Sequence, residues 1–322
     1  MKDFKIPKHT EQVIPQIKNL LKSLVLLGLV VGSFFLTQAG VDRIDASFLA
    51  IPGWFHFVLK WGFIIGLALV NNVLIMGLGI LGHEAAHRVL FNSVFWNDFC
   101  GGIFGALLLL PFHNFRNFHF THHGYTHQPG LDPEEPVNNH PIWFALIGGA
   151  FIGLYIHYKT LAVDLLSGSR KQQYQALKDV FSLSIVGAFY FYIVPMAGIS
   201  ILYTVVPTLL LLPLVFMFRN LSEHHGIPDQ ARKSTQQTEN PNVDSWIVLT
   251  NPLMTWLWSN TNYHQVHHRY PYLSYRYFPE IFEATKHEQP YAVVNGYFRC
   301  TINSLKRAYY ASDEDLKPFL TS

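Results

Sequence analysis

The chain has 322 residues, of which 50% are hydrophobic and only 14% are charged, and its formal net charge is +2. Soluble domains carry about 25% charged residues, so this composition indicates an integral membrane protein. The small net charge gives no indication of nucleic-acid binding, and two cysteines are too few for a disulfide framework. Because no repeat of fixed period or low-complexity linker divides the chain, we expect one membrane domain over residues 1–322.

The N-terminal part contains two long apolar stretches. Residues 1–19 are polar and lead into the first stretch without a small-residue cleavage site, so we expect a cytoplasmic tail and no signal peptide. Residues 20–39 and 54–81 are each long enough to cross the hydrocarbon core, which takes about 20 helical residues. The link between them is poorer in basic residues than the tail, so the positive-inside rule places this link outside.

The middle of the chain is less regular. Residues 99–111 are apolar but too short for a normal span, so we expect them in or just under the interface. Residues 161–180 are polar, whereas the apolar residues 181–198 and 200–218 suit two spans joined by a tight external turn. The apolar stretch 142–158 is of borderline length. If all histidine clusters meet at one site, an even number of spans separates them, so this stretch is predicted to be re-entrant or interfacial.

The predicted fold class is therefore an all-α integral membrane protein with four transmembrane helices. Residues 82–180 and 219–322 are expected to form a cytoplasmic, histidine-rich cap with interfacial helices, so the histidine clusters lie on the cytoplasmic face. The apolar stretch 246–258 is interpreted as an amphipathic part of this cap, because it has only about 13 residues and contains Asn251 and Pro252.

Histidine clusters are the main chemical signal. The chain has 17 histidines, and nine of them follow apolar stretches with the spacings H-x-x-x-H, H-x-x-H-H, a single histidine, and H-x-x-H-H again. These nine are His83, His87, His119, His122, His123, His224, His264, His267 and His268. Two histidines four apart on a helix share one face. The isolated histidines are interpreted as structural or surface residues; they are His9, His56, His140, His157 and His287.

Nine imidazoles are too many for one four-coordinate zinc, but they suit two five- or six-coordinate ions. Imidazole binds iron, zinc and copper alike, so the composition does not identify the metal. A redox metal such as iron would explain a large neutral ligand set, and the position at the membrane edge suggests a lipid-soluble substrate. A competing interpretation is that His83 to His87 is the H-E-x-x-H signature of a zinc metalloprotease, with Glu84 as the base. The metalloprotease interpretation would leave seven clustered histidines without a role. A non-redox class, such as a zinc hydrolase or a metal-handling membrane protein, remains an alternative.

The order and spacing of these boxes over residues 81–277 resemble the membrane fatty acid desaturase and hydroxylase superfamily. The resemblance implies that Asn220, four residues before His224, joins the nine histidines as a ligand through water. It implies two iron ions, with O2 as co-substrate. One ion would draw on His83, on His122 or His123 and on a third-box histidine. The other would draw on His87, His119, His224 and others.

The resemblance also implies an activity, namely an O2-dependent desaturase that introduces a double bond into the acyl chain of a fatty acid or membrane lipid. The alternative is a hydroxylase or ketolase of the same superfamily that acts on a carotenoid or alkyl chain. Electrons are expected from a separate ferredoxin or cytochrome b5, because no fused cytochrome b5 domain and no G-x-G-x-x-G site are visible.

Two groups of charged residues near the histidine boxes are open to two interpretations each. The basic residues could dock an acidic electron donor or simply flank the membrane; they are Arg219, Arg232, Lys233, Arg269 and Arg276. The loop from Asp132 to Glu135 could orient a ligand histidine or a substrate head group, or it could be a solvated turn.

Overall fold

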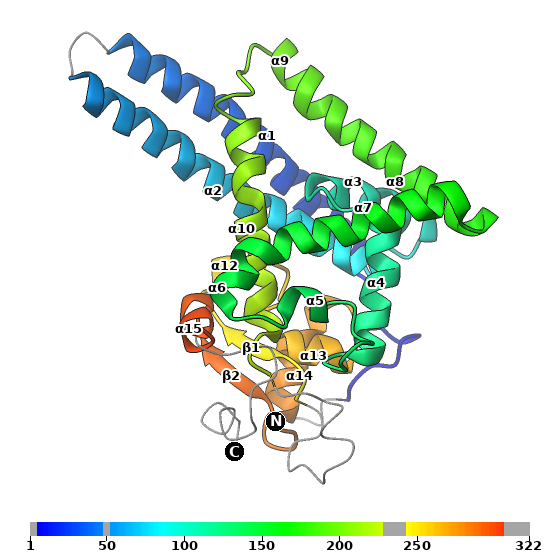
Figure 1. The fold of residues 1–322 in the computed structure, drawn as a ribbon. Coiled ribbons are helices and arrows are strands. Elements are labelled where there is room, and N and C mark those ends of the chain that lie inside the picture. The colour runs from blue at the N-terminus through cyan, green and yellow to red at the C-terminus, as the bar shows by residue number, and fades with distance from the viewer. Residues whose placement is uncertain (1–4, 48–51, 228–242, 306–322) are drawn as a thin grey trace.

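The computed structural model describes residues 5–47, 52–227 and 243–305, and most of these residues are helical. The first two helices, α1 (Gln16–Ala46) and α2 (Gly53–Ala86), form a long antiparallel hairpin (Figure 1). Both extend beyond the predicted spans 20–39 and 54–81. Leu26, Val30 and Phe34 of α1 are buried in one apolar cluster with residues of α2. The hairpin is therefore held by apolar packing along its inner side.

The next two helices are short and meet at a sharp bend. Helices α3 (Val94–Leu107) and α4 (Phe112–Tyr125) are bent by 95° relative to one another. A Cβ atom at Gly105 would lie 3.0 Å from the carbonyl oxygen of Leu110 in the link between the helices, so glycine favours this close approach of the backbone. The N-terminal half of α3 exposes Phe95 and Trp96, as expected for a helix at a membrane interface.

The middle of the chain forms two long helical rods. The first consists of α6 (Ile142–Phe144), a π-helical turn η2 (Ala145–Gly149) and α7 (Ala150–Ser167), and it is preceded by the short α5 (Glu135–Asn138). The second consists of α8 (Arg170–Ala188), the π-helical turn η3 (Phe189–Ile193) and α9 (Val194–Met196). A turn then leads to α10 (Val205–His224). The predicted pair of helices within 181–218 is present, but the first begins at Arg170, within the stretch that was predicted to be polar and cytoplasmic.

The predicted number of four spans is not confirmed. Among the described residues, five helices are long and apolar enough to cross a membrane, and the bent pair α3 and α4 would make a sixth. The five are residues 16–46, 53–86, 142–167, 170–196 and 205–224. In Figure 1, however, α7 runs across the ends of the other long helices instead of beside them. This placement agrees with an interfacial position of α7, which stays a prediction.

The C-terminal part forms a cap that is not all helical. Its elements are β1 (Trp246–Leu249), α12 (Pro252–Leu257), α13 (His264–Arg269), the 3-10 turn η4 (Tyr275–Tyr277), α14 (Phe278–Thr285), β2 (Ala292–Asn295) and α15 (Tyr297–Asn303). Strands β1 and β2 are parallel, with Trp246 opposite Ala292 and Leu249 opposite Asn295. The all-α prediction is thus wrong in this detail.

The stretch 246–258 is not one amphipathic segment but a strand followed by a short helix. The β-branched pair Ile247 and Val248 is fully buried and lies opposite Val293 and Val294, an arrangement that favours a strand. The side chain of Asn251 accepts a hydrogen bond from the backbone N–H of Met254 at 2.9 Å and so starts α12.

Buried polar contacts tie this cap to α1. The Lys22 ammonium donates a hydrogen bond to Ser259 Oγ at 2.8 Å, and the Tyr275 hydroxyl donates to Asn19 Oδ1 at 2.8 Å. Asn19 and Lys22 are buried, so these contacts are protected from water. They fix the segment that carries α13 against the N-terminal hairpin.

Candidate metal centre

The first two histidine boxes and His224 lie at the C-terminal ends of their helices, and the third box lies in the cap. His83 and His87 lie at the C-terminal end of α2, and the second box fills the last two turns of α4. His224 is the last residue of α10, and the third box forms most of α13. Segments that are distant in the sequence therefore bring all nine clustered histidines to one place.

Five of these histidines form a first group, called the five-histidine group below. Possible ligand atoms of His83, His87, His119, His123 and His267 all lie within 4.8 Å of one another. The Nε2 atoms of His87 and His119, of His119 and His123, and of His123 and His267 are each 3.0 Å apart. Two ligands at right angles on a metal with bonds of about 2.1 Å lie about 3.0 Å apart. The spacing therefore fits a shared ion.

The other four form a second group, called the four-histidine group below. His122, His224 and His268 offer ligand atoms within 4.8 Å of one another. His264 joins them, because its Nε2 lies 2.8 Å from His224 Nε2; His122 Nε2 lies 3.3 Å from the same atom.

This grouping agrees with the division that the resemblance implied in placing His83 with His123 and a third-box histidine, and it differs in that His87 and His119 do not lie with His224. In the structure, His87 and His119 lie with His83, while His122 lies with His224. Residues four apart on a helix share a face, so His119 and His123 point the same way. His122 is adjacent to His123 and is therefore rotated by about 100° from it around the helix axis.

Carboxylates approach four of the imidazoles from the side opposite the other histidines. The contacts from Nδ1 to oxygen are His122 to Asp132 at 2.9 Å, His268 to Asp244 at 3.3 Å, and His264 to Glu223 and His83 to Glu84 at 3.5 Å each. The hydrogen bond from His122 to Asp132 holds the proton on Nδ1 of that ring and leaves a lone pair on its Nε2. The 3.5 Å contacts of His83 and His264 are electrostatic contacts without a hydrogen bond. Facing lone pairs repel one another unless a cation lies between them, so the donor set fits bound metal.

Burial keeps several of these imidazoles neutral. It lowers the pKa of His87 to about 3, with the positive charge of neighbouring groups acting in the same direction. Burial also lowers the pKa of His264 and His267 well below the ordinary value of 6.5, assisted by the surrounding imidazoles. Neutral imidazole is the form that binds a metal, so these histidines are ready ligands at neutral pH.

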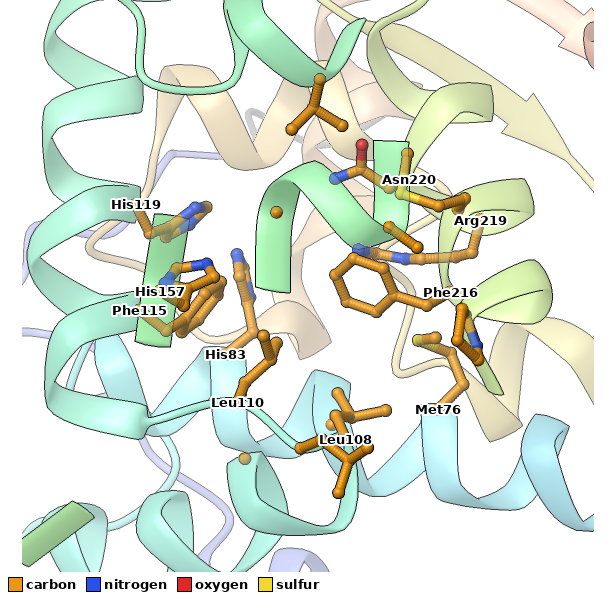
Figure 2. Close-up of a pocket in the computed structure, with 18 of the residues that line it drawn as sticks. Met76, His83, Leu108, Leu110, Phe115, His119, His157, Phe216, Arg219 and Asn220 are labelled. Carbon is orange, nitrogen blue, oxygen red and sulfur yellow. The ribbon is translucent and has the colours of Figure 1, made fainter. Parts of the chain in front are cut away.

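A cavity of about 110 Å³ adjoins both groups. Its wall includes His83 and His119 of the first group and His224 and His264 of the second. Most of the remaining wall is apolar, with Met76, Leu108, Leu110, Phe115 and Phe216 among its residues (Figure 2). An apolar space beside a polar cluster is the usual form of a site for a mostly apolar ligand.

Two further residues of the wall bear on the sequence predictions. Asn220, on the last turns of α10, lines the cavity beside its neighbour Arg219 (Figure 2). His157 of α7 also lines the cavity, although its isolation in the sequence favoured a purely structural role. It is 5% exposed, and its Nδ1 lies 2.5 Å from Asn114 Oδ1. Only its position in the fold identifies it, because no neighbouring histidine marks it in the sequence.

The basic residues near the histidine boxes differ in how exposed they are. Arg219 is buried, and its Nη2 lies 2.6 Å from Glu223 Oε1, so it cannot contribute to a docking surface as one interpretation held. Arg269 donates hydrogen bonds to Gln289 and to the carbonyl of Pro290, whereas Arg276 is exposed. Arg232 and Lys233 lie outside the described residues.

The loop after the second box is not a simple solvated turn. Asp132 is 2% exposed, and its Oδ2 accepts the backbone N–H of His127 at 2.8 Å. Its Oδ1 accepts the backbone N–H of Glu134 at 2.9 Å and also contacts His122. Asp132 is thereby fixed in the orientation that contacts the ring of His122. Asp244 and Glu223 likewise contact ligand histidines, His268 and His264 respectively. The spacing of the histidines in the sequence gave no signal for either carboxylate.

Comparison with known proteins agrees with the geometry. The family model described as fatty acid desaturase matches residues 44–298. The chain belongs to the fatty acid desaturase family. This confirms the family that the histidine boxes indicated, and it is a family of oxidoreductase enzymes.

The curated relatives of this desaturase-family protein are themselves named as desaturases. It is 28% identical over 152 residues to an sn-1 oleoyl-lipid 12-desaturase of Arthrospira platensis, covering 44% of this chain and 41% of the relative. It is 26% identical to a dihydrorhizobitoxine desaturase of Bradyrhizobium elkanii, covering 51% and 52%. It is 27% identical to an sn-1 acyl-lipid omega-3 desaturase (ferredoxin) of Synechocystis, covering 30% and 24%. The chain thus spans about half or less of the length of these relatives.

Proposed function

We propose that this protein is an O2-dependent di-iron desaturase that introduces a double bond into the acyl chain of a fatty acid or membrane lipid. The observation that carries the proposal is that two groups of histidine Nε2 atoms meet beside one apolar cavity. Relatives named as desaturases of lipid-bound acyl chains support the substrate class.

The metal ligands in this proposal are the nine clustered histidines and Asn220. The five-histidine group would hold one iron, and the four-histidine group would hold the other, with Asn220 acting through water. Iron bound there would supply, with O2, the redox chemistry needed to remove hydrogen from an unactivated C–H bond. A zinc hydrolase built on His83 and His87 alone is disfavoured, because three other histidines share the same position.

The protein's own contribution is to place the chain and exclude water. Met76, Leu108 and Phe216 would contact an acyl chain and bring its carbons beside His83 and His119. The mostly apolar wall excludes water, which prevents side reactions near the site. The buried carboxylates keep the ligand rings in place, so their Nε2 atoms need no reorganisation when metal binds.

We further propose four spans, formed by α1, α2, the rod of α8 and α9, and α10, with α7 at the interface and the histidines on the cytoplasmic face. The first two boxes and His224 all lie at the C-terminal ends of their helices, and α7 runs across the other long helices in Figure 1. Electrons would come from a separate carrier; one relative carries ferredoxin in its name.

Expression in a host that lacks the activity, followed by mass spectrometry of the lipids, tests the proposed function. We expect acyl chains with two fewer hydrogens, and we expect the His264→Ala variant to be inserted in the membrane but inactive. The exposed His287 is a matched control outside both groups, and His287→Ala should leave the product unchanged. A lipid product that has gained oxygen would show that the protein is a hydroxylase or ketolase and not a desaturase. A protein that contains one zinc and no iron would refute the proposal.

A further inference from the structure

The apolar cavity beside the histidine groups has two unlike ends. Figure 2 shows Arg219 and Asn220 near one end and Met76 and Leu108 at the other, with His83 between them. On α2, Met76 precedes His83 by seven residues, which corresponds to about 10 Å along the helix axis at about 1.5 Å per residue. The end at Met76 and Leu108, called the inner end below, therefore lies at a defined distance from the metal ligands.

The inner end is closed by apolar side chains. Met76 of α2, Leu212 of α10 and Leu108 between α3 and α4 all line the cavity and are buried. Leu212 lies level with Met76, because the side-chain amide of Asn72 donates a hydrogen bond to the carbonyl oxygen of Thr208 at 3.0 Å, and both are four residues further along their helices. Asn72 itself does not line the cavity. The wall at this end is therefore suited to hydrocarbon.

Leu108 is held in a fixed position at this end. A Cβ atom at Gly79 would overlap with Leu108 Cδ1, so glycine at this position lets the leucine side chain lie directly against α2. The next residue, Leu109, has a φ of 59°, in the left-handed region that leucine rarely adopts. The Tyr158 hydroxyl of α7 donates a hydrogen bond to the Leu109 carbonyl oxygen at 3.0 Å and helps to hold this strained backbone. Such strain persists only where the surrounding structure fixes it, and it clusters at functional sites.

The chemistry of the wall decides which part of an acyl substrate can occupy the inner end. A carboxylate or ester group buried among apolar side chains would lose its hydrogen bonds to water, whereas a terminal methyl group gains from burial there. We infer that the inner end binds the methyl end of the acyl chain and that Leu108 forms its end wall, so that the bond to be oxidised is selected by its distance from the methyl end. This inference rests on the proposed function, in which the substrate is an acyl chain.

Acyl chains of different length test the inference in the unchanged protein. A host that expresses the full chain is supplied with even- and odd-chain fatty acids, and mass spectrometry locates the double bond in each lipid product. The number of carbons between the double bond and the methyl end should stay constant, while the number to the carboxyl carbon changes with chain length. A position that is constant from the carboxyl carbon would overturn the inference.

Variants of the end wall then test the role of Leu108. Leu108→Ala leaves space for about three carbon atoms, so the chain can move further in and the double bond should lie about one to three carbons further from the methyl end. Gly79→Ala should have the opposite effect, because the displaced Leu108 side chain then takes up part of the inner end. Leu107→Ala is the matched control, because Leu107 is buried beside Leu108 but does not line the cavity. It should leave the position unchanged.

The outcomes separate the inference from the proposed function. The position of the double bond is independent of how much protein folds, so an unchanged position in both Leu108→Ala and Gly79→Ala would overturn the role of Leu108. A double bond at a constant distance from the carboxyl carbon would support desaturation and overturn the inference. An oxygenated product at a constant distance from the methyl end would refute desaturation and support the inference. If no acyl chain is oxidised, both are overturned.

Discussion

The ion pair between Arg219 and Glu223 offers a sharp test of how the site is built. The two residues are four apart on α10, and Arg219 Nη2 lies 2.6 Å from Glu223 Oε1. The same carboxylate oxygen lies 3.5 Å from His264 Nδ1. Replacing Arg219 by Met keeps most of the side-chain volume but leaves the Glu223 carboxylate buried without its cation.

Burial decides the size of the effect. On an exposed helix surface such a pair contributes about 0.3–0.5 kcal/mol. Here the side chains are only 11% and 1% exposed, so the buried regime applies, in which removal of one partner costs about 3–5 kcal/mol. We therefore expect Arg219→Met to lose about 3–5 kcal/mol of unfolding free energy. The double variant Arg219→Met with Glu223→Leu should recover most of this, because no unpaired charge remains.

Equilibrium unfolding in mixed detergent micelles measures these differences as a double-mutant cycle. The surface pair of Lys286 and Glu283 is a matched control, because its atoms also lie 2.6 Å apart but its side chains are 29% and 54% exposed. Lys286→Met should cost less than about 1 kcal/mol. The reasoning is wrong if Arg219→Met costs no more than Lys286→Met, or if the double variant is as unstable as the sum of its single changes.

Three other predictions concern pH, metal and packing. Burial and neighbouring imidazoles lower the folded-state pKa of His264 and His267, so the unfolded apo-protein binds more protons below about pH 6.5. Acid titration should therefore lower apo-protein stability from that pH downward, by up to about 1.4 kcal/mol per pH unit for each histidine; a flat profile would contradict this. Chelation of iron should lower the melting temperature, because metal binds only the folded state; equal melting of both forms would exclude this linkage. A Cβ atom at Gly77 would lie 2.8 Å from the carbonyl oxygen of Leu257, so Gly77→Ala should cost about 1–3 kcal/mol in thermal unfolding, whereas an unchanged midpoint would show that α12 moves aside freely.

Some features of the site were predictable because their signals are local. The spacing of His119, His122 and His123 is visible in the sequence, and so is their position after an apolar stretch. The partner of each imidazole was not predictable, because His264 contacts Glu223 across 41 positions and His268 contacts Asp244 across 24. Such contacts depend on how helices end and pack, for which the spacing of histidines carries no information.

Other features were misjudged for a similar reason. The strand β1 is short and lies beside β2, which comes more than 40 residues later, so its apolar residues suggested an amphipathic segment. Length and apolarity also leave α7 undecided, since they qualify it as a span whereas Figure 1 shows it crossing the other helices. Hydropathy indicates whether a helix can lie in an apolar environment. The direction in which the helix runs is decided by its packing against the other helices.

The sequence by itself determined the class of membrane protein, the family and the nine clustered histidines, because composition and fixed spacing along a helix are properties of the chain. Only the tertiary structure divided these histidines into a group of five and a group of four, since that division depends on the faces that α2, α4, α10 and α13 turn toward one another. It also decided that Asp132 and Asp244 lie behind one group and that an apolar cavity adjoins both. These arrangements join residues far apart in the chain, and the chemistry proposed for this site depends on them.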